Sequence, residues 1–281
     1  MQIYKDVKNL FYRFRDDDVM ALAAQLSYSL LISFFPFLIF LMTLIGFSPI
    51  KSADVLVGLN QTLPPTIYQM ISNIVIEVVD TKNSNLLSLS LVVTIWTAST
   101  GFKAVIKGLN KAYDETEKRS ILRLEITAFL CTLALTTVII LSIILLVLGE
   151  LIGNSIAQYV MIHPEDFLAL WDVFRYFIIL CVMVLIFAAL YRYTPSRRLS
   201  WREVFPGSVF ATIGWVIVSV GFSFYVNNFG NYSRLYGSIG AVIILLTWLF
   251  LTSIIIILGG EVNATLAFDR EGKEKPVGKK Y

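Results

Sequence analysis

Charge, histidine and cysteine are all scarce in this chain of 281 residues, and each scarcity excludes a class of protein. Charged residues make up 15% of the chain and apolar residues 57%, whereas soluble domains carry roughly 25% and 45–50%. The single histidine, His163, leaves no His-rich metal cluster, Ser/His/Asp triad or Cys/His pair to assemble. The two cysteines, Cys131 and Cys181, lie inside apolar runs and indicate neither a disulfide nor a metal site.

Phosphate-binding motifs and long polar segments are also missing. No GxxxxGK[ST] or GxGxxG pattern occurs, so the chain alone gives no sign of an ATP-driven pump. The longest segment between apolar runs, residues 48–85, is shorter than the roughly 40 residues that a free-standing core needs. The sequence predicts one membrane domain, residues 19–268, between an N-terminal segment, residues 1–18, and a basic tail, residues 269–281. We expect no catalytic residue, metal site or cofactor.

Long apolar runs are what the chain has instead, and its mean hydropathy is +0.73. A helix that rises about 1.5 Å per residue needs roughly 20 apolar residues to cross a hydrocarbon layer. Six runs approach or exceed this length: residues 19–50, 86–102, 126–148, 173–190, 204–226 and 239–258. They lack the polar alternation of barrel strands, so we expect an all-α, polytopic membrane protein with six transmembrane helices.

Lysine and arginine are distributed unevenly between the two sides of these runs. Of the 23 basic residues, 19 lie in the N-terminal segment, in the tail and in the loops after the second and fourth runs. This bias places those segments and both termini in the cytoplasm and predicts a multi-pass membrane protein. Basic residues beside spans meet anionic headgroups, so we expect membrane lipids as partners and no nucleic acid.

The first loop on the opposite side, about residues 51–84, contains an amphipathic pattern. Its apolar residues recur with a helical period at Ile67, Met70, Ile71, Ile74, Val75 and Val78. We expect a helix that either lies passively in the outer headgroup layer or caps a cavity among the spans.

Two features predict how the spans pack. Pro36, near the middle of the first run, removes a backbone hydrogen bond and predicts a kink that serves either packing or gating. In the fifth run Gly207, Gly214 and Gly221 recur every seven residues, with Ala211 between the first two. Such a seam lets another helix approach closely, either as static packing or as a sliding or homo-oligomer contact.

Glu261 is the clearest ionisable residue inside an apolar stretch, and such residues are functional candidates because hydrocarbon disfavours them. Glu261 is expected either at the cytoplasmic boundary, where it meets solvent or a loop arginine, or deeper. In the deeper position it needs a cationic partner, and Lys103 and Arg119 are the candidates.

Other polar residues fall in the same, cytoplasmic, half of the spans. They predict a polar vestibule on a substrate or ion pathway, or else hydroxyls that bond to their own helix carbonyls. These residues are Gln25, Ser27, Ser99, Thr100, Thr252, Ser253 and Asn263. Asp16, Asp17 and Asp18 are explained better as favourable charges at a helix start than as a metal site, since adjacent carboxylates point in different directions.

Several blocks of the sequence resemble the YihY/BrkB family of bacterial inner-membrane proteins. They include Ala21–Tyr28 with Phe35-Pro36, Trp96–Gly101, Leu109–Tyr113 with Arg119, Tyr191–Pro195, Trp201, Pro206-Gly207, Leu235–Ala241, Trp248 and Gly259–Ala264. The resemblance covers residues 10–268 and implies a six-helix membrane protein. Members of that family carry the labels ribonuclease BN and serum-resistance virulence factor, and others are linked to lipid or lipopolysaccharide export, so the resemblance transfers no catalytic residue.

Three functions follow as hypotheses. The first is a transporter or flippase-like protein that moves a lipid or small solute through a cavity among the spans. The second is a non-catalytic accessory protein of envelope assembly, and the third is a membrane-bound ribonuclease. No cytoplasmic segment is long enough to cradle RNA and organise two metal-binding carboxylates, which counts against the third.

Overall fold

A computed structural model describes residues 12–46, 84–133, 164–229 and 239–270, together with the positions 10, 53, 56, 68, 72, 75–77 and 137. Within these residues every regular element is helical. The five long helices are α2 (Val19–Gly46), α5 (Ser84–Ala112), α7 (Pro164–Tyr193), α8 (Trp201–Phe229) and α10 (Ile239–Arg270). Residues 121–133 are also helical. The expected all-helical architecture is confirmed for this part of the chain. A helix pairs all its backbone polar groups internally, as hydrocarbon requires.

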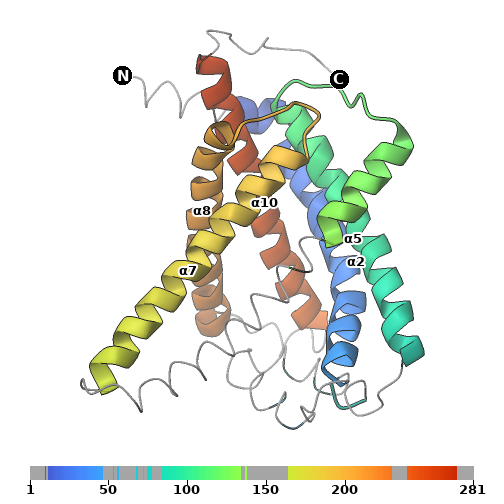
Figure 1. Ribbon diagram of the computed structural model, residues 1–281, viewed down its shortest axis with the longest axis vertical. Helices are drawn as coiled ribbons and strands as arrows, with labels where there is room; N and C mark the ends of the chain where they lie inside the picture. The colour runs from blue at the N-terminus through green and yellow to red at the C-terminus, as the bar shows by residue number, and fades with distance from the viewer. Residues whose placement is uncertain are drawn as a thin grey trace.

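The ends of the five long helices gather into two sets. Figure 1 shows the start of α2, the ends of α5 and α7, the start of α8 and the end of α10 together at the top. The basic loops that follow α5 and α7 therefore lie at this end, which we call the basic end.

Four described helices are long and apolar enough to cross a membrane. They cover residues Val19–Phe40, Tyr176–Tyr193, Trp201–Asn228 and Ile239–Arg270. The expected second run, 86–102, lies within α5, which does not meet the same criterion, and the expected third run, 126–148, extends beyond the described residue 133. The amphipathic segment of about residues 51–84 lies mostly outside the described residues.

Large apolar side chains are exposed along the outer faces of α7 and α8. Leu185 is 59% exposed, and Ile217 and Val220 are each 65% exposed. A water-soluble protein rarely exposes so continuous an apolar surface, whereas hydrocarbon solvates it. The exposure pattern agrees with the hydropathy in identifying a membrane protein.

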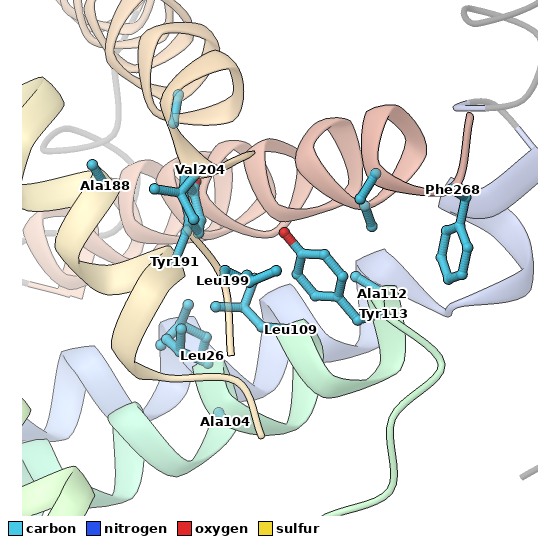
Figure 2. Packing of buried hydrophobic residues seen from close by; sticks show 14 residues of the cluster. Leu26, Ala104, Leu109, Ala112, Tyr113, Ala188, Tyr191, Leu199, Val204 and Phe268 are labelled. Atoms are coloured by element: carbon cyan, nitrogen blue, oxygen red, sulfur yellow. The ribbon is translucent and has the colours of Figure 1, made fainter. Parts of the chain in front are cut away.

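The helix α10 is central to the packing, since it contacts α2, α5 and α8, while α2 packs along α5 and α7 packs on α8. The main buried cluster lies near the basic end, and Figure 2 shows Leu109 and Tyr113 of the α5 end close to Tyr191 of α7. α2 continues as a helix through Pro36, whose expected kink stays a prediction. The polar candidates at the basic end are thus held by packed helices.

Candidate functional site at the end of α10

Glu261 is buried among the helices and forms an ion pair with Arg13. Its side chain has no exposed surface, and Arg13 Nη1 lies 3.8 Å from Glu261 Oε2. The Arg13 side chain is also buried, with its guanidinium 4.9 Å from the centre of the Phe268 ring. The cation beside Glu261 therefore comes from the segment before α2 and is itself held by the last turns of α10.

Lys103 and Arg119, the cations expected from the sequence, bind other carboxylates. Lys103 Nζ lies 2.7 Å from Glu125 Oε1, and Arg119 Nη2 lies 2.7 Å from Glu117 Oε2. In both pairs the acid, Glu125 or Glu117, lies in the chain segment that follows α5. The expected pairing of Glu261 was therefore wrong, because Arg13 is distant in the sequence and is brought to α10 only by the fold.

A sharp turn at Asp18 brings Arg13 to α10. Asp17 N donates to Arg13 O at 2.9 Å, which closes a helical turn, and Leu22 N donates to Asp18 O at 3.0 Å, which starts α2. Asp18 has a φ of 51°, a left-handed conformation that Asp tolerates better than most residues. The helical turn around Arg13 and α2 are therefore two elements joined at one residue.

The three consecutive acids at this turn have different surroundings. Asp17 is buried, whereas Asp18 accepts a hydrogen bond of 2.7 Å from Lys111 Nζ, which lowers the pKa of Asp18. Among the described residues, these acids are not part of any group of three His, Cys, Asp or Glu residues that could hold a metal ion. Asp18 instead connects the start of α2 to the end of α5.

Tyr113 belongs to the same buried cluster, although its position was not predicted as a site. Burial is the main cause that raises the pKa of its hydroxyl, and the charges of Arg197, Glu261 and Arg13 also act on it. Arg197 lies over its ring at 5.9 Å, and its hydroxyl has no hydrogen-bond partner among the described residues. Figure 2 shows this hydroxyl directed towards α10. The site therefore contains one buried phenol between charges of both signs.

Asn263 binds the backbone of α8 with both ends of its amide. Gly207 N donates to Asn263 Oδ1 at 2.6 Å, and Asn263 Nδ2 donates to Val204 O at 3.1 Å. A Cβ atom at Gly207 would overlap the carbonyl oxygen of Gly259, so glycine is needed for this approach. Asn263 thereby holds α8 against α10, which is a packing role beside the charged pair.

Tyr191 holds the end of α7 against α10 in a similar way. Its buried hydroxyl donates to Ile256 O at 2.8 Å, and a Cβ atom at Gly259 would overlap that hydroxyl. A Cβ atom at Gly260 would overlap the side chain of Leu109 from α5. The Gly259-Gly260 pair therefore gives two helices close access to α10, directly before Glu261.

The remaining small residues of the predicted seam differ along α8. Gly214 faces Ile255 of α10, where an added Cβ atom would lie 3.1 Å from the nearest side-chain atom, and Ala211 is fully buried. At Gly221 an added Cβ atom would meet nothing within 4 Å. Close approach to α10 thus concerns the half of the seam nearer the basic end.

The hydroxyls of the predicted vestibule bond mainly to their own helices. Ser27 Oγ donates to Ala24 O at 2.9 Å, and Thr100 Oγ1 donates to Thr97 O at 2.6 Å. Gln25 is exposed on α2, while Ser99 and Thr252 are buried. Thr252 Oγ1 has no hydrogen-bond partner among the described residues. The alternative of local bonding therefore holds for Ser27 and Thr100.

A polar network joins the loop after α5 to the loop after α7. Asn110 is buried; its Nδ2 donates to Glu117 Oε2 at 2.9 Å and its Oδ1 accepts from Ser196 N at 2.7 Å. Arg119 Nη2 donates to Thr194 O at 2.8 Å. The hydrogen bond from Arg119 is the main reason that the pKa of Glu117 falls to about 2. Arg119 thus joins two loops at the basic end and pairs with Glu117 instead of Glu261.

A separate cavity of about 200 Å³ lies between α8 and α10, away from the basic end. Its lining is mostly apolar and includes Ser219, Asn227 and Trp248, and Trp248 Nε1 donates to Ser219 Oγ at 3.2 Å. It shares no residue with the group of Glu261, Arg13, Phe268 and Tyr113, which we call the Glu261 cluster.

Comparisons with known proteins agree on a family. Residues 10–280 match the family described as Virulence factor BrkB. A Bacillus subtilis protein named ribonuclease-like protein YfkH is 40% identical over 260 residues, which cover 92% of this chain and 94% of that protein. A protein of Alteromonas mediterranea, named UPF0761 membrane protein, is 40% identical over 91 residues, or 32% of this chain and 31% of its own length. No solved structure matches the chain.

Proposed function

This chain belongs to the Virulence factor BrkB family, and we propose, from the geometry of its buried charges, that it is a transporter or flippase-like protein of the bacterial inner membrane. It moves a lipid or a small solute along a pathway that passes the buried Glu261 cluster. The proposal includes six transmembrane helices with both termini in the cytoplasm. The lysine and arginine bias of the sequence supports this topology.

The observation that carries the proposal is the buried pair of Glu261 and Arg13. Removing two charges from water costs several kcal/mol each, and apolar residues of similar volume often pack at least as stably. Ionisable groups inside membrane-spanning helices are functional candidates by default, and Glu261 lies within the candidate span Ile239–Arg270. In this proposal the pair separates during transport, when the helical turn that carries Arg13 moves relative to α10.

Separation would expose a carboxylate and a guanidinium at the basic end, close to the buried hydroxyl of Tyr113. Such a set binds a polar or charged group while it passes between helices. The apolar outer faces of α7 and α8 can contact the acyl chains of a lipid substrate, so the proposal includes lipids as well as small solutes.

Reconstituted vesicles test the proposal. Fluorescent phospholipid in the inner leaflet should become accessible to a membrane-impermeant quencher in vesicles with the protein, or a trapped small dye should escape. Glu261→Gln should abolish the effect in protein that elutes as a monodisperse species, whereas Glu125→Gln, at an exposed ion pair, should retain it. Wild-type vesicles that behave like empty ones with both probes would refute transport.

The name of the relative YfkH, a ribonuclease-like protein, motivates a second candidate, a ribonuclease. The acidic residues that such an enzyme could use to bind metal ions are Asp16–Asp18. Of these, Asp17 is buried and Asp18 binds Lys111. Cleavage of RNA by purified protein, lost in Asp16→Asn and Asp18→Asn, would replace transport with this activity. An accessory protein, in contrast, should tolerate both Glu261→Gln and Gln25→Ala without loss of phenotype.

A further inference from the structure

Arg192, Tyr193 and Trp201 form a cluster at the basic end, where α7 ends and α8 begins; we call it the Arg192 cluster. The Arg192 guanidinium lies 4.7 Å from the centre of the Trp201 ring and 5.6 Å from that of Tyr193. The two rings meet edge to face with centres 6.3 Å apart. Aromatic faces attract a guanidinium and restrict its rotation.

Both helix ends that carry the cluster are fixed by other contacts. Tyr191, one residue before Arg192, binds Ile256 O of α10. At the start of α8, Ser200 N and Oγ both donate to Glu203 Oε2, at 2.6 and 2.7 Å, in a capping arrangement. The guanidinium is therefore held in place before any ligand arrives, which lowers the entropy lost on binding.

No described residue uses the donor groups of Arg192. Across the described helices and loops it forms no ion pair and no hydrogen bond, and Glu203, the nearest acid in sequence, is engaged by Ser200. A guanidinium stacked on rings keeps its N–H edge free, and that edge matches two oxygens of a phosphate. Three further arginines, Arg197, Arg198 and Arg202, lie in the same loop and helix start.

The exposed rings indicate the depth of the cluster. Tyr193 is 56% exposed, Trp201 48% and Phe205 55%, at the end of a span and the start of the next. Tyrosine and tryptophan at such positions lie at the level of the lipid headgroups. A phosphate that meets Arg192 at this depth belongs to a phospholipid, since the rings beside it contact the glycerol and the first acyl carbons.

We propose that the Arg192 cluster is a binding site for the phosphate of an anionic phospholipid. The site goes beyond the proposed transport, because it needs no movement of the bound lipid. It selects by charge: a headgroup without a compensating cation leaves its phosphate free for Arg192, whereas the choline of phosphatidylcholine is repelled by the surrounding arginines.

Native mass spectrometry of the full chain in detergent tests this site by comparing phosphatidylglycerol with phosphatidylcholine. The wild type should bind phosphatidylglycerol more tightly. Arg192→Gln should weaken that binding about fivefold, as expected for one basic side chain near an anionic surface. Trp201→Leu should weaken it comparably, and Tyr193→Phe should retain it because the ring remains. Arg15→Gln, an exposed arginine at the same end, is the matched control.

Equal losses in Arg192→Gln and Arg15→Gln would overturn the site in favour of general surface charge. Soluble glycerol phosphate provides a second arm: displacement of the lipid by equimolar soluble ester would overturn the lipid assignment. Both results concern binding in detergent, so they are independent of whether the vesicle assay detects transport.

Discussion

Glu261 Oε2 and Arg13 Nη1 lie 3.8 Å apart, although one residue stands near the end of α10 and the other precedes α2. The pair connects α10 to the helical turn before α2, which Asp18 also joins to Lys111 of α5. Its burial makes the loss of one partner more harmful than the loss of both.

Single removal of a partner is therefore the first prediction. Arg13→Gln should lower the stability of the detergent-solubilised protein by about 3–5 kcal/mol, because Glu261 is left as a buried charge. The double variant Arg13→Gln/Glu261→Gln should be more stable than Arg13→Gln. Thermal melting of the three proteins measures this coupling, and additive effects of the two changes would show that the pair is not coupled.

The amide of Asn263 gives a second prediction. Asn263→Ala removes the side-chain partner of Gly207 N in a buried place, whereas Val204 O still accepts from Ser208 Oγ; the change should cost about 1–3 kcal/mol. Asn228→Ala is the control, since Asn228 is exposed and bonds only to Phe224 O of its own helix. Similar melting temperatures for the two variants would contradict the clamp between α8 and α10.

Glycine positions on α8 and α10 give a third prediction. Gly259→Ala should destabilise the fold by about 1–3 kcal/mol through overpacking, because the new methyl group overlaps the Tyr191 hydroxyl. Gly221→Ala should be neutral or slightly stabilising, since the added methyl group meets open space and alanine favours a helix. Equal effects of the two substitutions in thermal melting would refute the close approach.

The loop network predicts a pH dependence. The folded-state pKa of Glu117 is about 2, below the ordinary value of 4.5, so its ionised form contributes stability above about pH 4.5 that is lost as the pH falls towards 2. Glu117→Gln should remove this part of the acid sensitivity. Melting temperatures measured between these pH values should converge for wild type and variant at the acid end; parallel curves would contradict the assignment.

Sequence patterns predicted the helices well because lipid imposes a simple requirement. Apolar runs located α2, α7, α8 and α10, and the charge bias grouped the same helix ends that lie together in Figure 1. The glycine spacing indicated close helix contact, although it could not tell that Gly207 meets α10 while Gly221 meets nothing. A periodic pattern defines one face of a helix but does not identify which part of it is covered.

The site was harder to predict, because its partners are set by the fold. Glu261 stood out as an acid in an apolar stretch, yet Arg13 counted only as one of many basic residues before a span. Tyr113 and Tyr191 were visible only as members of family-like blocks, since an aromatic residue at a helix end is ordinary in a membrane protein. The distances between these side chains depend on the turn at Asp18 and on the glycines that let Tyr191 approach α10.

The left-handed turn at Asp18 has a practical consequence for anyone handling this protein. The short segment before this turn carries Arg13, which forms the ion pair with the buried Glu261. A purification tag or fluorescent fusion at the start of the chain should therefore disturb the ion pair of Arg13 and Glu261. One placed after Arg270, where α10 ends, should leave this pair intact.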